Sequence, residues 1–227
     1  MTDIVIFGAG GLGSQVRDIL LQARRHRAVA FLDSNPARAG TESEHLEILG
    51  GFEQTPQLLR QGVRCAIVAI GDNAQRVHVA QELRQAGMQL ASAIHPLASL
   101  SRSAAFGQHL IIGPRATVCV HATICSHAVL SAGTICDHDS FVGPGAFLHP
   151  AVRLAGAVFV DGLATLGVGA CVIPGRRIGV AATVEPGAVV TNDVPAATCV
   201  GGAPARPIRR EVSRFERGSI NELAATA

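Results

Sequence analysis

The hexads LSAGTI, CDHDSF and VGPGAF, residues 130–147, belong to a run of sixteen hexads that keeps one register from Leu100 to Pro195. A six-residue period matches neither the roughly 3.6-residue turn of an α-helix nor the roughly two-residue alternation of a flat β-strand. It is typical of a solenoid of parallel β-strands, in which three hexads close one triangular coil. Residues eighteen apart in the sequence are therefore expected to lie on neighbouring coils.

The first position of the hexad is a bulky apolar residue in fifteen of the sixteen repeats, and we expect it to face the interior of the coil. The fifth position is mostly alanine or another small residue. The one exception at the first position is Cys136. The sixteen first-position residues are Leu100, Phe106, Ile112, Val118, Ile124, Leu130, Cys136, Val142, Leu148, Leu154, Val160, Leu166, Val172, Ile178, Val184 and Val190.

Composition excludes several classes of protein. The 227 residues give room for two modest domains, and the net charge of +2, with lysine and arginine scattered along the chain, gives no reason to expect a nucleic-acid partner. Mean hydropathy is +0.33, but the most apolar stretch, residues 154–175, keeps the hexad pattern, so buried coils explain it better than a membrane span. We recognise no export signal before Asp3 and expect a cytoplasmic protein.

The sequence before the hexads has an α/β pattern. A short apolar strand, residues 4–7, precedes the glycine turn GAGGLG (residues 8–13) and a stretch of helical spacing from Ser14 to Leu21. Residues 28–33 and 65–70 are predicted as a second and a third strand, and residues 74–87 as the helix that follows. This order predicts a Rossmann-like domain, and its small size favours a mononucleotide over a dinucleotide.

Polar and glycine residues at the ends of these strands are the candidates for substrate binding. A glycine turn before a helix can present amide groups to a phosphate, and an acid at the end of the second strand can bind a ribose or a base. Two other interpretations stay open, because the glycines can serve tight packing alone and Asp33 can cap the turn before Asn35. The candidates are Gly8, Gly10, Gly11, Gly13, Asp33, Asp72 and Asn73.

The exception at Cys136 marks a second candidate site. Three polar residues, Asp137, His138 and Asp139, follow it, and His138 holds the third position of its hexad, which is expected to point away from the core. The eighteen-residue spacing places His121 one coil below Asp139 and Gly156 one coil above His138. An imidazole, a carboxylate and an unobstructed amide are what acyl transfer needs: a base, a group that orients it, and a donor to the oxyanion.

Several segments together carry a family resemblance. IVIFGAGGLG, FLDSN, AIGDNAQR, IHP, CDHDS and VGGAPARPI occur in an order that resembles the acetyltransferases of bacterial sugar biosynthesis that include PglD and NeuD. The resemblance implies an N-terminal Rossmann-like domain that binds the nucleotide part of a nucleotide-linked sugar. It also implies a C-terminal left-handed parallel β-helix that forms a homotrimer, with acetyl-CoA between neighbouring β-helices. The hand comes from the resemblance, since the usual crossover rule predicts the opposite.

The resemblance also implies roles for residues. His138 corresponds to the general base and Asp139 to the acid that orients it, in a direct attack on the thioester without an acyl-enzyme. Gly156 corresponds to the glycine that contacts the thioester carbonyl. The residues that we expect to bind acetyl-CoA are Ala155, Gly156, Ala164, Gly202 and Arg206.

The predicted function is N-acetylation of the amine of a nucleotide-linked 4-amino-4,6-dideoxy sugar. O-acetylation of sialic acid or a related sugar is one alternative, and a non-catalytic, nucleotide-binding trimeric scaffold is another. No metal is predicted, because hexapeptide carbonic anhydrases use a histidine pair five residues apart, and none of the hexad histidines has that spacing. Two departures from the family concern the sugar and the acyl group: Leu12 and Phe147 stand where many members carry histidine.

The predicted domains are residues 1–95, 96–206 and a tail, 207–227, in which residues 210–227 are expected to form a short helix. His109 and His127 should stack on each other, His95 should cap or hinge the domain junction, and His149 should be solvated at a corner. Outward apolar residues are expected to be exposed and to favour lateral association. They are Val120, Phe141, Phe147 and Phe159.

Overall fold

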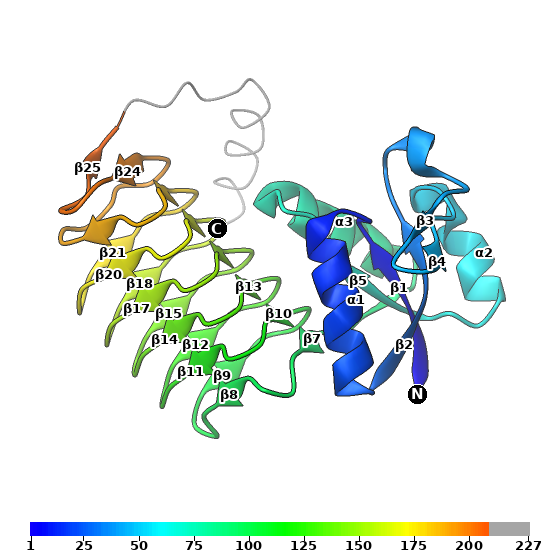
Figure 1. Cartoon of the computed structure of the whole chain (residues 1–227), viewed down its shortest axis with the longest axis horizontal. Helices are drawn as coiled ribbons and strands as arrows, with labels where there is room; N and C mark the ends of the chain where they lie inside the picture. The colour runs from blue at the N-terminus through cyan, green and yellow to red at the C-terminus, as the bar shows by residue number, and fades with distance from the viewer. Residues whose placement is uncertain (209–227) are drawn as a thin grey trace.

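The computed structural model describes residues 1–208, and the helix predicted for residues 210–227 lies outside them. A small α/β domain is followed by coils that stack from β7, beside that domain, to β24 and β25 at the far end (Figure 1). The fold class predicted from the sequence is confirmed: a Rossmann-like domain and a left-handed parallel β-helix. No helix within residues 1–208 is long and apolar enough to cross a membrane.

The N-terminal domain is built on a four-stranded parallel sheet of order β2-β1-β5-β6. Its strands are β1 (Thr2–Phe7), β2 (His26–Leu32), β5 (Cys65–Val68) and β6 (Gln89–Leu90). Its helices are α1 (Gly11–Ala23), α2 (Thr55–Arg60) and α3 (Asn73–Gln85), with 3-10 turns at Pro36–Arg38 and Phe52–Gln54 and a hairpin of β3 (Glu42–Ser43) and β4 (Leu46–Glu47). The third strand ends two residues earlier than predicted, and α2, β6 and the hairpin were not predicted.

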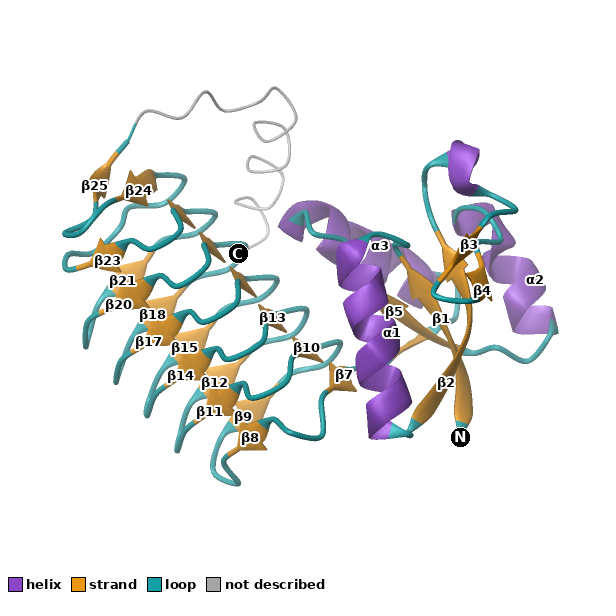
Figure 2. Ribbon diagram, in the orientation of Figure 1, coloured by secondary structure: helices purple, strands orange, loops and turns teal. Residues whose placement is uncertain are grey.

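Both faces of this sheet are covered, as the continuous apolar run in β1 requires. Ile4 and Ile6 pack under α1, whereas Val5 and Phe7 pack under α2 and α3. All four are at most 2% exposed. Figure 2 shows α1 on the side of the sheet next to β7.

The β-helix has three faces, each a stack of strands that are two residues long, except for β24, which has three. The first face holds β7 (Ala93–Ile94), β10 (Ile111–Ile112), β13 (Val129–Leu130), β16 (Phe147–Leu148), β19 (Thr165–Leu166), β22 (Thr183–Val184), β24 (Cys199–Gly201) and β25 (Arg206–Pro207). The second holds β8 (Ser99–Leu100), β11 (Thr117–Val118), β14 (Ile135–Cys136), β17 (Arg153–Leu154), β20 (Cys171–Val172) and β23 (Val189–Val190). The third holds β9 (Ala105–Phe106), β12 (Thr123–Ile124), β15 (Phe141–Val142), β18 (Phe159–Val160) and β21 (Arg177–Ile178).

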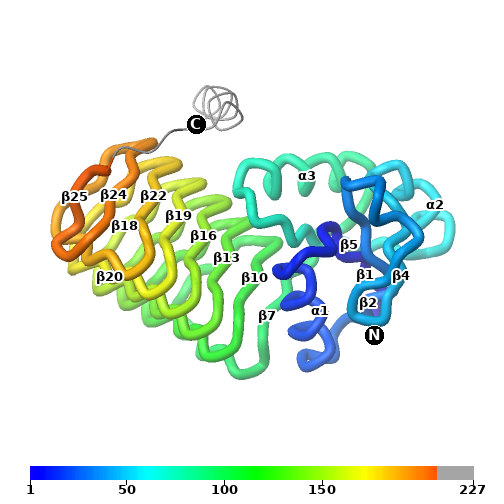
Figure 3. Tube along the Cα trace, turned by 45° about the horizontal axis from the view of Figure 1, so that its top comes forward, coloured from blue at the N-terminus to red at the C-terminus, as the bar shows by residue number. Residues whose placement is uncertain are grey.

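The hexad pattern is confirmed as the pattern of the core. From Ile112 to Val190 the first-position residues are 0 to 3% exposed, and strands eighteen residues apart pair in parallel (Figure 3). Leu100 and Phe106 are less buried, since they belong to the lowest coil, which no further coil covers. At the upper end the spacing shortens to sixteen, because Ile178 pairs with Val194 and Val184 with Val200.

The turns of the coils give the fourth hexad position a left-handed backbone conformation. His121 and Asp139 have φ values of 58° and 57° there, in a region where histidine and aspartate are more common than most side chains. His109 and His127 share this conformation, with φ values of 56° and 66°. Polar residues of one column therefore repeat the same backbone geometry on successive coils.

The N-terminal domain covers the lower part of the first face. Ile111, Val129 and Phe147 pack in one apolar cluster with residues of β1 and α1. The prediction that Phe147 is exposed is therefore wrong: it points out of the β-helix as expected, but the other domain covers it to 7% exposure. Val120 and Phe159 are exposed as predicted, at 49% and 46%, and Phe141 is half-buried against Phe159. β7, which precedes the boundary predicted after residue 95, already pairs with β10 of the β-helix.

Two glycines of the turn between β1 and α1 are required by packing. A Cβ atom on Gly13 would overlap the carbonyl oxygen of Gly8, and a Cβ on Gly8, which has φ +107°, would lie 2.6 Å from the Ala69 carbonyl oxygen. Gly10 and Gly11 face open space, with nothing within 4 Å of a Cβ. The packing interpretation of the motif thus holds for Gly8 and Gly13 and does not account for Gly10 and Gly11.

We predict that Gly13→Ala lowers the free energy of unfolding by at least about 2 kcal/mol, because the backbone of the turn must move to admit the methyl group. Gly11→Ala, at the first residue of α1, should change it by less than about 0.5 kcal/mol. Urea unfolding followed by circular dichroism measures both values. Equal values for the two variants would contradict this assignment.

Candidate active site

His138 and Asp139 lie in the turn between β14 and β15, at the corner where the second face meets the third. His138 Nδ1 lies 2.8 Å from Asp139 Oδ2, and the two side chains are 54% and 55% exposed. On the coil below, His121 Nδ1 lies 3.6 Å from Asp139 Oδ1. The contact predicted between His121 and Asp139 is therefore present, at the distance of an ion pair rather than a hydrogen bond.

The charges around the imidazole favour its protonated form. The hydrogen bond with Asp139, and then the charge of Asp137, raise the pKa of His138 above its ordinary value of 6.5. The same hydrogen bond lowers the pKa of Asp139. In neutral His138 the Nδ1–H donates to this carboxylate, so the lone pair of Nε2 is available to accept a proton.

Gly156 lies against the imidazole from the coil above, as predicted. A Cβ atom on Gly156 would overlap the His138 ring at Nε2 and Cε1, so only glycine leaves the ring in this position. The amides on either side of Gly156 are hydrogen-bonded within the β-helix. The Ala155 N–H donates to the Val172 carbonyl (3.1 Å), and the Ala157 N–H donates to the His138 carbonyl (2.9 Å). Within residues 1–208 no hydrogen bond takes up the Gly156 N–H. An amide donor is thus left beside the ring.

Asp137 is a neighbour to which the sequence analysis gave no role. Its Oδ1 accepts the backbone N–H of His138 at 2.7 Å, which restrains the backbone that carries the imidazole. Below it lies Cys119, and burial together with the charge of Asp137 raises the pKa of that thiol. The signal for Asp137 was available, since it shares the polar interruption of the hexad pattern with His138.

The residues predicted to bind acetyl-CoA do not all lie at this corner. Ala155 and Gly156 are in it, but Ala164 is fully buried, because its fifth hexad position points into the coil. The side chain of Ala164 therefore cannot reach a ligand, and only its backbone is left for the predicted contact. Gly202 and Arg206 are exposed near β24 and β25, at the far end of the β-helix.

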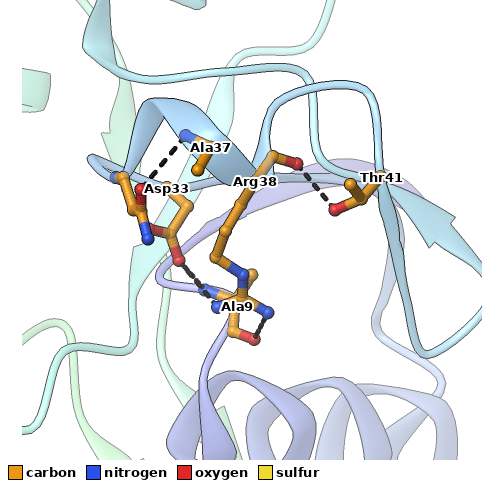
Figure 4. A network of polar contacts seen from close by, with 6 residues as sticks. Ala9, Asp33, Ala37, Arg38 and Thr41 are labelled. Carbon is orange, nitrogen blue, oxygen red and sulfur yellow. Dashed lines mark hydrogen bonds and ion pairs between the residues drawn. The ribbon is translucent and has the colours of Figure 1, made fainter.

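The predicted nucleotide site lies at the carboxyl ends of β1 and β2, where hydrogen bonds from neighbouring residues hold the Asp33 carboxylate (Figure 4). Asp33 Oδ2 accepts the Ala9 N–H at 3.0 Å and Arg38 Nη1 at 3.1 Å, and Oδ1 accepts the Asn35 N–H at 2.9 Å. Arg38 also donates to the Ala9 carbonyl at 2.8 Å. Asp33 thus caps the turn, as one of its two interpretations predicted, and its contact with a ribose or a base stays a prediction. It also holds the guanidinium of Arg38, which the sequence did not indicate, beside the glycine turn.

Asp72 and Asn73 have contacts other than those expected of substrate-binding residues. Asp72 Oδ1 accepts the Gln75 N–H at 2.7 Å and caps α3. Asn73 Nδ2 reaches across to the β-helix, where it donates to the Leu163 carbonyl at 2.8 Å and to Thr165 Oγ1 at 3.0 Å. The structure therefore places the side chain of Asn73 between the two domains.

The other histidines lie in structural positions. His109 and His127 contact each other on neighbouring coils as predicted, with ring centroids 5.0 Å apart and ring planes tilted by 53°. His95 caps its turn by accepting the Leu97 N–H at 3.0 Å. His149 is half-buried rather than solvated, because its ring stacks on Phe147 at 4.3 Å between centroids.

The chain is similar to known proteins in both domains. Residues 3–83 match the family model of the PglD N-terminal domain. Among solved structures, PerB from Caulobacter crescentus in complex with CoA and GDP-perosamine is 33% identical, with a TM-score of 0.87 over 92% of this chain and 98% of that one. A PerB variant with one histidine replaced by alanine was also solved with both ligands.

Two further similar proteins are also acetyltransferases by name. The acetyltransferase domain of PglB from Neisseria gonorrhoeae, in complex with acetyl coenzyme A, is 25% identical over 91% of this chain and 98% of that one, with a TM-score of 0.83. A tetrahydropyridine-dicarboxylate N-acetyltransferase of Staphylococcus aureus is 39% identical over 71 residues, and the chain spans only 30% of the length of this curated relative. With PerB matched along nearly its whole length, the chain belongs to the PglD- and NeuD-like family of hexapeptide-repeat sugar acetyltransferases.

Proposed function

We propose that the chain transfers an acetyl group from acetyl-CoA to the amine of a nucleotide-linked 4-amino-4,6-dideoxy sugar, with His138 as the general base. The observation that carries this proposal is the corner site itself. It combines an imidazole oriented by a carboxylate with an available glycine amide, in a chain similar along nearly its whole length to an enzyme solved with CoA and GDP-perosamine.

The chemistry follows from the geometry of His138. The neutral amine attacks the thioester carbonyl carbon while Nε2 of His138 accepts a proton from its nitrogen, and Nδ1–H keeps its bond to Asp139. In this proposal the Gly156 N–H, beside the imidazole, donates to the oxyanion of the tetrahedral intermediate. Collapse of the intermediate breaks the C–S bond, and the imidazolium returns the proton to the departing thiolate. The products are the N-acetylated sugar and CoA.

The nucleotide would bind at the glycine turn. Gly10 and Gly11 are exposed at the N-terminus of α1, where amide groups and the helix dipole favour a phosphate. The pair Asp33 and Arg38 borders the same edge of the sheet. Gly8 and Gly13 act through the shape of the turn, and Asp72 through the cap of α3.

We propose a homotrimer with acetyl-CoA between neighbouring β-helices. The N-terminal domain packs on the first face, whereas His138 lies at the corner between the second and the third. Val120, exposed at that same corner, and Phe159, exposed on the third face, give a neighbouring subunit apolar surface to cover. We further propose that the protein works in the cytoplasm, where acetyl-CoA is available.

The function is tested by thiol release from acetyl-CoA with a panel of acceptors: UDP-, GDP- and dTDP-linked amino sugars and free sialic acids. We expect release with at least one nucleotide-linked amino sugar and none with sialic acid. Release with sialic acid alone would favour O-acetylation. Binding of nucleotide without release for any acceptor would favour the non-catalytic scaffold.

His138→Ala should lower kcat by roughly 10² to 10⁴-fold, since it removes the proton acceptor and leaves the binding surfaces in place. The dissociation constants of CoA and of the nucleotide-linked sugar, measured by calorimetry, should change less than about threefold. His149→Ala, which removes a half-buried histidine from the turn between β16 and β17, where the first face meets the second, is the matched control and should keep near wild-type kcat. Full activity of His138→Ala would refute the role of the base.

The activity should rise with pH through the titration of His138. Because its pKa lies above 6.5 and only the neutral ring accepts a proton, the midpoint of the acid limb of kcat/KM should lie above pH 6.5. Asp139→Asn removes the hydrogen bond that raises this pKa, so the limb should move to lower pH while the plateau falls. Rates measured from pH 5 to 9 test this, and an unmoved limb in Asp139→Asn would contradict the assignment.

A further inference from the structure

A buried cation joins the two domains. Arg76 of α3 is 0% exposed, and burial lowers its pKa to about 10. Its guanidinium donates to five oxygens: Nη1 to the Ile70 carbonyl (2.9 Å) and the Gly71 carbonyl (3.5 Å), Nη2 to Asn73 Oδ1 (2.8 Å) and the Gly145 carbonyl (2.8 Å), and Nε to the His127 carbonyl (3.2 Å). Two of these oxygens belong to the β-helix, so the arginine links the domains by directional bonds.

The bonds of α3 reach the coils that carry the candidate site. Gly145 lies at the end of the coil that begins at β13 and includes His138. Leu163, whose carbonyl accepts from Asn73, ends the next coil, which includes Gly156. The first turn of α3 is therefore bonded to both coils of the site.

The same segment begins at the nucleotide edge. β5 runs beside β1 to the glycine turn, where the Ala69 N–H donates to the Phe7 carbonyl at 2.7 Å and the Ala69 carbonyl packs against Gly8. Only a few residues separate Ala69 from the bonds of Asn73 and Arg76. A short path, partly covalent and partly hydrogen-bonded, thus connects the glycine turn to the coils of His138 and Gly156.

A second connection between the domains joins Val68 of β5 to His109 of the β-helix. The Val68 N–H donates to His109 Nε2 at 2.8 Å, and His109 Nδ1 lies 3.0 Å from His127 Nδ1. Because His109 accepts at Nε2, its neutral ring carries its proton on Nδ1 and donates to His127, whose own proton must then sit on Nε2. This chain of bonds exists only while both rings are neutral, as their burial and the nearby cations Arg76 and Arg84 favour.

We infer that Asn73, Arg76, His109 and His127, here called the interdomain clamp, are positioning residues of the acyl transfer. They fix the nucleotide edge of the N-terminal domain relative to the coils that carry the base and the glycine amide. In a symmetric trimer this also fixes the edge relative to the neighbouring subunits, whichever subunit supplies His138. The inference rests on the proposed function, because it assigns the clamp a role in aligning that acceptor.

The clamp is expected to affect the rate of acyl transfer through the alignment of the amine with the thioester. An amine must approach the thioester carbon to about 3–3.5 Å in the correct direction, and a displacement of about 1 Å can lower the rate roughly 100-fold. An apolar interface alone resists sliding weakly, since its contacts are non-directional. Hydrogen bonds from a planar guanidinium to fixed carbonyls supply the missing direction.

The test uses Asn73→Ala, which removes the bonds to Leu163 and Thr165 from a partly exposed side chain. Gln75→Ala, exposed on the same helix, is the matched control. In the trimeric protein we expect Asn73→Ala to lower kcat for the nucleotide-linked sugar about tenfold or more. The calorimetric dissociation constant of CoA should stay within about twofold, and Gln75→Ala should behave as wild type. Arg76→Lys keeps the charge but loses the planar set of donors. Its kcat should lie between that of Asn73→Ala and that of Arg76→Met.

A second experiment measures the opening of the interdomain clamp and does not depend on activity. Hydrogen exchange of the Val68 amide, compared with that of Gly8, which is bonded within its own domain to the Leu32 carbonyl, reports opening at His109. As pH falls below about 6.5, opening should increase by up to roughly tenfold per pH unit for each histidine that gains a proton. His127→Gln can accept the same bond but cannot titrate, so it should reduce this dependence.

The outcomes separate the two proposals. An active wild type whose Asn73→Ala variant keeps wild-type kcat overturns the positioning role and leaves the proposed function intact. A wild type that transfers acetyl to no acceptor overturns the proposed function and the positioning role with it. Protection of Val68 that does not change between pH 7 and pH 5 overturns the part assigned to the histidine pair.

Discussion

The position of each catalytic candidate depends on one repeated contact, an apolar side chain that fills the interior of the coil at every sixth residue. These side chains are almost completely buried from Ile112 to Val190, and each packs on equivalents one coil above and below. A slip of one residue would turn them toward the solvent, so the register has no near alternative. His138 at the third position and Asp139 at the fourth therefore have to lie at a corner, one coil above His121 and one below Gly156.

This dependence explains which parts of the site could be predicted. Spacing alone relates His138 to Gly156 and His121 to Asp139, because each pair lies in one column of a regular stack and the two columns are adjacent. The same arithmetic gives the contact between His109 and His127. Ala164 shows how the register limits a prediction made from the resemblance. Its hexad position turns its side chain into the coil, so that side chain is not part of the site surface.

Contacts between the domains could not be predicted from the repeat. Nothing in the hexad pattern shows that Arg76, from a helix of the other domain, lies against Gly145, or that Phe147 is covered. These contacts depend on how a small sheet meets the first face of the β-helix, and that arrangement has no period. The glycine turn could be predicted in part. Its motif is recognisable in the sequence, but only the packing seen in the structure distinguishes the role of Gly8 and Gly13 from that of Gly10 and Gly11.

The two departures from the family are related by the same domain contact. Phe147 belongs to the apolar cluster that joins the domains, and Leu12 packs against that cluster. The positions are distant in the sequence, yet both side chains contact one apolar cluster, Phe147 as a buried member and Leu12 as a partly buried neighbour. An imidazole at either position would bring a polar group to this surface and require a partner there. Leu12 and Phe147 therefore both contribute apolar contacts where the two domains meet.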